Sequence, residues 1–271
     1  MASSPHIVVI DYHKGNLSSV VRGLARAGAD AASSNDPAAI RGADGLVLPG
    51  VGSFYDAITF MHECGQDGAV LDAIAAGAPF LGICLGQQLL FSRGDEGVPA
   101  DAPAVLAADP YGAELSPGVV FEADGRRWVR GLGVLEGSCT LLPSRRLKIP
   151  HVGWDQVYPN MDGPACPLLA GFDEGANVYF THSFALDGDV EASCVAARTH
   201  YARNFASVTW RDNVFGCQFH PEKSSRHGLK ILENFVGIVA RSTGGGPAAG
   251  VPAGAAAASG GVPVASGEVE A

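Results

Sequence analysis

Short apolar runs alternate with helix-like spacing through the first third of the chain. Residues 6–10, 45–48 and 79–83 are apolar runs of the length and character of buried parallel strands. Between and after them, apolar residues recur at helical intervals with Gly or Ser near the boundaries. The predicted helices are residues 17–28, 53–65, 69–76 and 87–91. This alternation predicts an α/β fold around a mostly parallel central sheet.

The second half is richer in short strands. The predicted strands are residues 119–121, 128–129, 178–180, 194–197, 206–209 and 214–219. They indicate a small antiparallel part added to the main sheet. Leu229, Leu232, Val236 and Val239 then mark a closing amphipathic helix.

Two segments lack either pattern. From residue 94 to about residue 118 the chain is dominated by Pro, Ala, Asp and Gly, and we expect a surface insertion of about residues 94–130 that includes the next two short strands. Residues 242–271 are almost wholly Gly, Ala, Pro, Ser and Val, too little side chain to offset the entropy of ordering. We therefore expect one domain over residues 1–241, followed by a disordered tail.

Charge and cysteine content narrow the functional classes. The formal net charge is −10, and Lys and Arg are not clustered, so nucleic acid is not expected as a partner. Without a signal-like start or an apolar run of about 18 residues, we expect no membrane span and a cytoplasmic location. The six cysteines form no C-x-x-C pair and the histidines form no metal-binding pattern. Reduced thiols are expected, with no metal and no cofactor.

The strongest chemical signal is Cys84, which stands between two glycines in Gly82-Ile83-Cys84-Leu85-Gly86, where a strand meets a helix. A nucleophile in such a turn projects from the carboxyl end of the sheet, and the glycines relieve crowding. A helix N-terminus favours the thiolate and aims the Leu85 N–H at a developing oxyanion. The alternative is a buried cysteine between glycines that serve only packing. We favour acyl transfer with Cys84 as the nucleophile.

A candidate base follows the strand of residues 214–219, in His220-Pro221-Glu222. A cysteine nucleophile needs an imidazole base, and the imidazole needs an orienting group. In extended backbone, residues two apart share a face, so Glu222 is predicted to bind one ring nitrogen while the other faces Cys84. The alternative is a strand-end histidine with a helix-capping glutamate.

Residues 49–52, Pro-Gly-Val-Gly, lie between a predicted strand and a helix. Two glycines permit a backbone that turns an N–H into an oxyanion hole, although a plain turn is the commoner role of such a segment. Of the other histidines, His151 and His182 lie beside aromatic or glycine-rich segments, where a structural role is also possible.

Together and in this order, these segments resemble the class I (triad-type) glutamine amidotransferases, which release ammonia from glutamine on a flavodoxin-like sheet. Within that family the chain is most similar to the glutaminase subunits of imidazole glycerol phosphate synthase, of histidine biosynthesis. The resemblance spans roughly residues 6–240. It is carried by residues 10–12 with 15–17, 48–52, 79–91, 131–133, 149–155, 179–183 and 215–224.

The resemblance implies a triad in which Cys84 attacks the glutamine amide, His220 is base and then acid, and Glu222 orients it. Water then hydrolyses the thioester. The oxyanion hole would comprise Val51, Gly52 and Leu85, and the glutamine would be held by Gln88, Glu96 and the backbone near His182 and Ser183.

The resemblance also implies a partner, because released ammonia needs an acceptor site and this chain has no room for one. That partner would be a (β/α)₈-barrel cyclase subunit, in a heterodimer that makes imidazole glycerol phosphate and aminoimidazole carboxamide ribotide. His13 and Lys14 depart from the family pattern in a loop expected to face the partner. We hypothesise that the peptide of residues 49–52 is a switch that places or withdraws one oxyanion donor.

Three alternatives remain. The first is a glutaminase subunit for another acceptor, such as pyridoxal phosphate synthase. The second is a cysteine peptidase or other hydrolase that uses the same turn. The third is an inactive scaffold subunit. The segments 11–16 and 150–154 argue against the first, and the three filled triad positions argue against the last.

Overall fold

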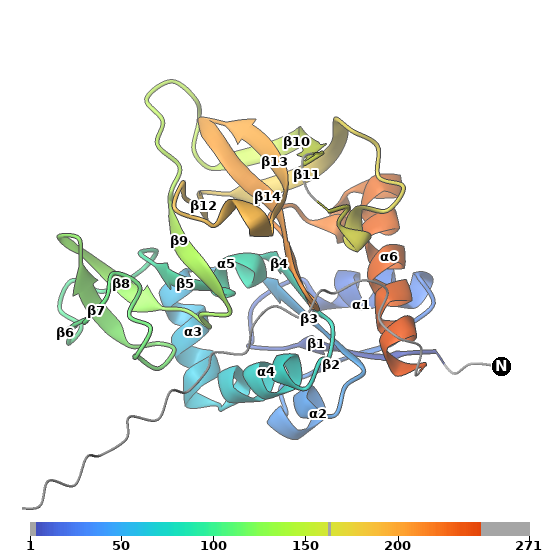
Figure 1. Ribbon diagram of the computed structural model, residues 1–271, viewed down its shortest axis with the longest axis horizontal. Helices are drawn as coiled ribbons and strands as arrows, with labels where there is room; N and C mark the ends of the chain where they lie inside the picture. Colours follow the sequence, from blue (N-terminus) through green and yellow to red (C-terminus); the bar gives the residue numbers. More distant parts are fainter. Residues whose placement is uncertain (1–3, 162–163, 245–271) are drawn as a thin grey trace, which may run out of the picture.

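The computed structural model describes residues 4–161 and 164–244 (Figure 1). The last helix, α6 (Ser225–Thr243), continues two residues beyond the boundary predicted at residue 241. The rest of the tail predicted to be disordered lies outside the described residues. None of the described helices combines the length and the apolar character that a membrane crossing needs.

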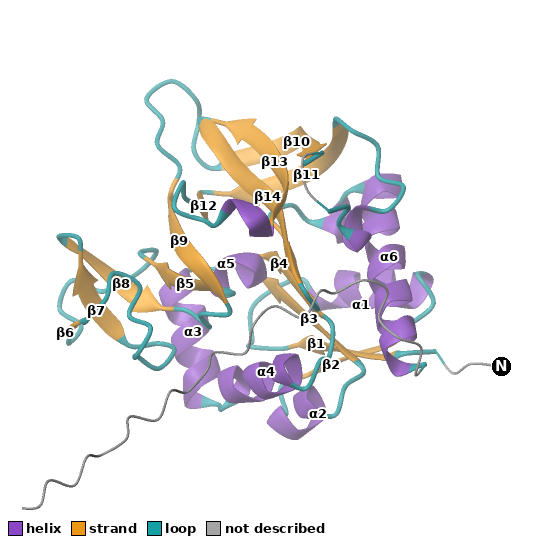
Figure 2. Cartoon of the chain, viewed as in Figure 1, coloured by secondary structure: helices purple, strands orange, loops and turns teal. Residues whose placement is uncertain are grey.

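A nine-stranded sheet forms the centre of the molecule (Figure 2). Its order is β11 (Ala176–His182), β10 (His151–Pro159), β13 (Val195–Tyr201), β14 (Arg203–Arg211), β15 (Val214–Cys217), β4 (Phe80–Cys84), β3 (Gly45–Gly50), β1 (His6–Ile10) and β2 (Asp30–Ser34). Neighbours from β15 to β2 are parallel, and those from β11 to β15 are antiparallel. The parallel part has the flavodoxin-like order, which confirms the predicted fold class.

Helices cover both faces of the parallel part, and alternate strand residues separate the two cores. Val8 and Ile10 of β1 pack in one core with residues of α2 (Pro37–Arg41), α3 (Phe54–Glu63) and α4 (Gln66–Ala75). Ile7 and Val9 pack in the other core with residues of α1 (Leu17–Arg26) and α6. Because both faces are buried, β1 is a continuous apolar run rather than an alternating one.

A second, six-stranded sheet lies beside the first. Its order is β12 (Phe184–Leu186), β9 (Leu135–Leu141), β5 (Phe91–Gly94), β8 (Arg126–Arg130), β7 (Val120–Ala123) and β6 (Val105–Leu106). The insertion of residues 94–130 supplies three strands of this sheet: β7 and β8 lie where strands were predicted at residues 119–121 and 128–129, and β6 was not predicted. The helix after Cys84 is α5 (Leu85–Leu89), so the prediction of residues 87–91 is wrong at both ends, and Phe91 begins a strand.

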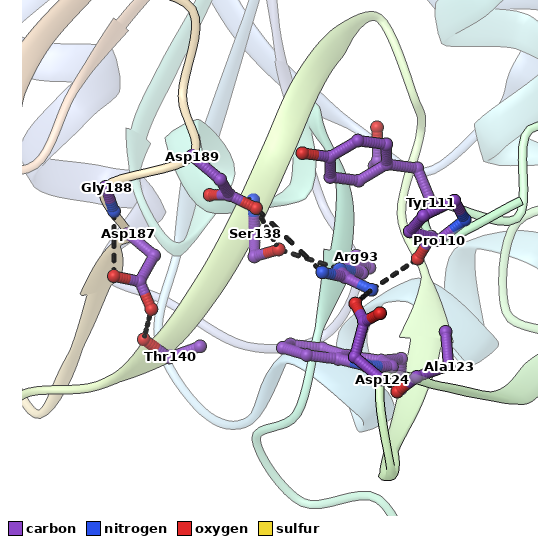
Figure 3. Close-up of polar contacts among 12 residues, drawn as sticks. Arg93, Pro110, Tyr111, Ala123, Asp124, Ser138, Thr140, Asp187, Gly188 and Asp189 are labelled. Carbon is purple, nitrogen blue, oxygen red and sulfur yellow. Dashed lines mark hydrogen bonds and ion pairs between the residues drawn. The ribbon is translucent and has the colours of Figure 1, made fainter.

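Arg93 of β5 fixes the insertion to the rest of the molecule (Figure 3). Its buried guanidinium donates to Ser138 Oγ at 2.7 Å, to Asp124 at 3.1 Å and to the Pro110 carbonyl. The same group lies 4.1 Å from the centre of the Trp128 ring and 4.9 Å from that of Tyr111. One arginine thus joins β9, β8 and the loop before β7, and β5 leads directly to Glu96 at the pocket.

Candidate active site

Cys84 occupies a strained turn between β4 and α5. Its φ of 55° and ψ of −109° are unusual for a residue with a side chain. The turn is tight: a Cβ on Gly86 would overlap the Leu48 carbonyl, and one on Gly82 would overlap the Gly86 backbone. Both flanking glycines are therefore required by close approach, as the sequence predicts. The helix that follows has only five residues, so it supplies no long helix dipole at Cys84.

The predicted base and its orienting carboxylate are in contact. His220 Nδ1 lies 2.9 Å from Glu222 Oε1, and both side chains are buried. The pairing is as predicted, but its expected geometry is wrong: residues Pro221–Lys223 form a turn of 3₁₀ helix, not extended backbone. Ser224 holds this turn, because its Oγ donates to the His220 carbonyl at 2.6 Å.

The charge state of His220 is set by its two neighbours. Burial lowers the pKa of His220, but the negative charges of Cys84 and Glu222 outweigh burial and raise it to about 10. In the described part of the chain, Nε2 of His220 has no hydrogen-bond partner. The interaction with Cys84 is thus a main cause of the raised pKa, and among the described residues no other group bonds His220 Nε2. This arrangement suits a thiolate–imidazolium pair that exchanges a proton with substrate.

A cavity of about 260 Å³ opens at Cys84. All the predicted oxyanion and glutamine-binding residues line it: Val51, Gly52, Leu85, Gln88, Glu96, His182 and Ser183. Pro150, Thr181 and Phe184 complete the lining. The structure thus brings together residues from five separate segments of the sequence, while their individual roles stay predictions.

The Val51 peptide is held by Tyr12. The Val51 N–H donates to the Tyr12 hydroxyl oxygen at 3.0 Å, and the hydroxyl donates to the Val51 carbonyl at 3.2 Å. Burial raises the pKa of Tyr12, so the side chain stays a neutral phenol. Gly50 allows this contact, because a Cβ there would lie 2.7 Å from the Tyr12 oxygen. In this state the Val51 N–H is engaged in a hydrogen bond to Tyr12. That bond must break before the N–H could bind an oxyanion.

The neighbouring loop holds the two residues that depart from the family pattern. Lys14 Nζ pairs with Asp56 of α3 at 3.0 Å, and its stem lies over Gly52. His13 adopts a φ of 65° and contacts the Phe60 ring edge-on at 5.1 Å between centroids. Both side chains therefore tie this loop to α3 beside the Val51 peptide.

Glu96 is a carboxylate in a largely buried setting. Its Oε2 accepts the Phe54 N–H at 3.3 Å. Burial raises its pKa to about 7; the Phe54 N–H opposes this shift, and the charges of Asp95 and Asp56 add to it. A group with this pKa is charged above neutrality and can then bind a substrate ammonium.

His182 and His151 form a buried pair. His182 Nδ1 donates to the Phe184 carbonyl at 2.8 Å, so Nε2 of its neutral ring is the acceptor. His151 Nδ1 lies 3.1 Å from that Nε2. Burial, with the charges of His151 and His220, lowers the pKa of His182 to about 3 despite the Phe184 bond. Both ring nitrogens of His182 are engaged. His182 therefore offers the pocket its backbone and ring surface, and no free imidazole nitrogen.

Three functional neighbours were missed by reasoning on sequence alone: Tyr12, Gln218 and Ser224. Gln218 Nε2 lies 3.5 Å from Cys84 Sγ. Both Gln218 and Ser224 are inside the segment that carries the resemblance, and Gln218 precedes His220 by two residues, which is the spacing of a shared face. Within the described residues, no group of three or more His, Cys, Asp or Glu side chains is placed to hold a metal.

Comparisons with known proteins identify the family of the chain. The family model for glutamine amidotransferase class-I matches residues 8–238. The chain is 43% identical over 229 residues to the imidazole glycerol phosphate synthase subunit HisH of Symbiobacterium thermophilum, covering 84% of this chain and 92% of that protein. It is 41% identical over 229 residues to the same subunit of Syntrophotalea carbinolica, covering 84% and 98%.

Solved structures share the fold at lower identity. A glutamine amidotransferase crystal structure matches with a TM-score of 0.58 and 16% identity, covering 85% of this chain and 99% of that one. The glutaminase domain of Trypanosoma brucei CTPS, solved with bound acivicin, matches with a TM-score of 0.54 and 13% identity, covering 88% and 94%. With more than four-fifths of its length matched at about 40% identity, the chain belongs to the class-I glutamine amidotransferases, within the family of imidazole glycerol phosphate synthase subunits HisH.

Proposed function

We propose that Cys84, His220 and Glu222 form the triad with which this glutamine amidotransferase hydrolyses glutamine to glutamate and ammonia. The observation that carries the proposal is the strained Cys84 turn beside a buried His220 whose Nδ1 is 2.9 Å from Glu222. A nucleophile, a base and an orienting carboxylate are the minimum set for acyl transfer through a thioester.

The reaction follows from these positions. The Cys84 thiolate attacks the side-chain amide carbon, and the carbonyl oxygen becomes an oxyanion facing the Leu85 N–H. The His220 imidazolium gives its proton to the nitrogen as the C–N bond breaks, and ammonia leaves. A water molecule then attacks the thioester while His220 Nε2 takes its proton. Glutamate departs and the Cys84 thiolate is restored.

The oxyanion hole needs the peptide of residues 49–52 as its second part. Gly52 and Val51 line the same cavity as Leu85, but the Val51 N–H is bonded to Tyr12. A single positioned donor is worth about 100-fold or more in rate, so this bond keeps the site short of full activity. The peptide is therefore the natural point at which a partner and its substrate switch glutamine hydrolysis on.

Glu96 and the Thr181–Phe184 segment would hold the amino-acid end of glutamine. The Glu96 carboxylate suits the α-ammonium, and the backbone at His182 and Ser183 faces the same cavity as Gln88 and Cys84. Free glutamine carries both an α-ammonium and an α-carboxylate for these groups to bind. A glutamine residue within a peptide lacks both charges, so the site favours free glutamine.

The ammonia is proposed to pass to a (β/α)₈-barrel cyclase subunit that forms imidazole glycerol phosphate and aminoimidazole carboxamide ribotide, in a heterodimer. The two relatives described above carry the name of one subunit of that synthase. Exposed large apolar side chains fit a protein contact: Val51, which lines the cavity, is 42% exposed, and Val152 and Trp154, on the strand that follows the cavity residue Pro150, are 56% and 54% exposed. All six cysteines are free thiols, which fits a reducing compartment such as the cytoplasm.

One experiment tests both halves of the proposal. The chain is combined with the barrel subunit and its ribotide substrate, and synthesis is driven either by glutamine or by ammonium salt. Cys84→Ala is expected to abolish glutamine-driven synthesis and to leave ammonium-driven synthesis intact. The control is Cys64→Ala, since Cys64 is the exposed thiol and lies outside the cavity.

Two results would overturn the proposal separately. Persistent glutamine hydrolysis in Cys84→Ala would remove the nucleophile assignment. If the chain hydrolyses glutamine normally but neither co-purifies with the barrel subunit nor supports glutamine-driven synthesis, the partner assignment is wrong. That result would point to another acceptor synthase.

A further inference from the structure

Gln218 contacts the sulfur of the proposed nucleophile. Its side chain is fully buried between the end of β15 and α5. Its Nε2 lies 3.5 Å from Cys84 Sγ, within hydrogen-bonding reach of a sulfur acceptor. Its Oε1 lies 3.0 Å from Gln88 Nε2. Among the described residues, the Thr181 carbonyl lies 3.9 Å from Sγ, and His220 interacts with the same sulfur.

The direction of the Gln218 amide is fixed by a chain of donors and acceptors. The Phe184 carbonyl can only accept, so the Gln88 atom 2.8 Å from it must be the NH₂ group. The second hydrogen of that NH₂ then needs an acceptor, which is Gln218 Oε1. If the Gln218 amide were turned over, two NH₂ groups would face each other at 3.0 Å. The only consistent arrangement therefore points the Gln218 NH₂ at Cys84.

We propose that Gln218 is a further catalytic residue, whose amide N–H donates to Cys84 Sγ and stabilises the thiolate. The inference rests on the proposed role of Cys84 as nucleophile. A hydrogen bond to the charged form of an acid favours that form, and such bonds are stronger when the acceptor is an anion. The thiol proton moves to His220 Nε2, and Gln218 and the imidazolium then share the negative sulfur.

Gln218 acts in both halves of the reaction. In the resting site it increases the fraction of thiolate available for attack. In the second half the sulfur leaves as a thiolate when water breaks the thioester, and the same N–H stabilises the departing charge. A neutral amide serves this role without adding a proton that could compete with His220 for the leaving ammonia.

The same network limits what Gln88 offers to substrate. Both hydrogens of Gln88 Nε2 are committed, one to the Phe184 carbonyl and one to Gln218 Oε1. Its Oε1 is the atom left for a ligand, and an acceptor suits an N–H of glutamine rather than its α-carboxylate. Gln88 is thus a positioning residue for Gln218 as well as part of the cavity wall.

The test measures how the reactivity of Cys84 depends on pH in the full-length chain without substrate. Iodoacetamide alkylation is followed between pH 5 and 10 by mass spectrometry of the peptide that contains Cys84, because Cys64 is also exposed. Gln218→Met removes the donor at similar size. Gln218→Glu keeps an oxygen for Gln88 to donate to but places a second oxygen against the sulfur. The midpoint is expected to rise by about one pH unit in Gln218→Met and further in Gln218→Glu.

The matched control is Gln87→Met. Gln87 is equally buried on α5, but its amide donates to the Ala206 carbonyl at 3.3 Å and, among the described residues, makes no hydrogen bond to Cys84. Its alkylation midpoint should equal that of the wild type. Gln88→Leu, which frees the Gln218 amide to turn, should shift the midpoint in the same direction as Gln218→Met, so the idea remains testable if a Gln218 variant does not fold.

The outcomes separate this inference from the proposed function. Midpoints at the wild-type value in folded Gln218 and Gln88 variants, or an equal shift in Gln87→Met, overturn the role of Gln218. Such a result leaves the triad standing if Cys84→Ala has lost glutamine hydrolysis. Full hydrolysis by Cys84→Ala overturns both, because the sulfur would then not be the nucleophile.

Discussion

The hydroxyl of Tyr12 binds both the N–H and the carbonyl of Val51, at 3.0 and 3.2 Å. It thereby holds the peptide that the sequence predicts as part of an oxyanion hole. A phenol suits this task because it both donates and accepts. The proposed switch thus depends on one atom, the Tyr12 hydroxyl oxygen. A substitution can remove that oxygen and keep the aromatic ring that packs in the core.

Tyr12→Phe is expected to increase glutamine hydrolysis by the chain alone by about tenfold, because one modest hydrogen bond no longer opposes release of the Val51 N–H. Initial rates of glutamate formation without partner measure this. Tyr158→Phe is the control, since it loses a hydroxyl bond to Gln156 in an exposed position. Unchanged basal activity in a folded Tyr12→Phe protein would show that this bond does not restrain the peptide.

Glu222→Gln should lower kcat by about 100-fold or more and change KM little. The substitution removes the charge that orients His220 and helps raise its pKa, so the imidazolium becomes a less stable partner of the thiolate. Steady-state kinetics in the presence of partner separate the two constants. Glu233→Gln on α6, an exposed residue paired with Lys230, should retain wild-type kcat. Equal activity of the two variants would contradict the triad.

The ionisation of Glu96 is expected to make kcat/KM depend on pH. With a pKa of about 7 it is neutral below pH 7 and charged above it, so kcat/KM should fall as the pH drops through 7. In Glu96→Gln, kcat/KM should be low at all pH values and lack this step, with the loss appearing mainly in KM. A retained step at pH 7 in Glu96→Gln would assign the titration to another group.

Arg93→Met should destabilise the chain by about 2–4 kcal/mol, because it leaves buried acceptors unpaired and removes the cation between two aromatic rings. Urea unfolding followed by circular dichroism measures the change. The matched variant is Arg126→Met, whose half-exposed side chain contacts the same Trp128 ring from 4.7 Å and pairs with Asp95. A smaller loss of unfolding free energy is expected for Arg126→Met. Equal losses in the two variants would mean that Arg93 stabilises the insertion no more than Arg126 does.

Local sequence patterns were sufficient for the three buried parallel strands β1, β3 and β4 and for the contact between His220 and Glu222. The strands β1, β3 and β4 are buried on both faces, so each is an apolar run, and Cys84 is flanked by glycines that its turn requires. His220 and Glu222 were found because they are neighbours in sequence, although the turn that joins them was not foreseen.

Strands with exposed faces were harder to predict. β2 pairs only with β1 and is mostly exposed, so its sequence, Asp-Ala-Ala-Ser-Ser, carries no apolar pattern. β10 was recognised as a motif but not as a strand, because Val152 and Trp154 are exposed on it while His151 is buried.

Contacts between distant residues were not predictable from one sequence. Tyr12 and Val51 are 39 residues apart, and Gln218 and Cys84 are 134 apart. Each bond depends on the fold that brings two strand ends together. The insertion has little regular pattern before residue 119, and Arg93, just outside it, contacts Pro110 and Asp124 across a separation that no local pattern reveals.

The carbonyl oxygen of Phe184 receives both His182 Nδ1 and Gln88 Nε2, each at 2.8 Å. It therefore decides which ring nitrogen of His182 carries hydrogen and, through Gln88, which end of Gln218 faces the sulfur. That oxygen belongs to the main chain. Side-chain substitutions at position 184 that leave the backbone path unchanged keep this oxygen in place. The orientation of the Gln88 and Gln218 amides therefore depends on the backbone at position 184 and not on which side chain stands there.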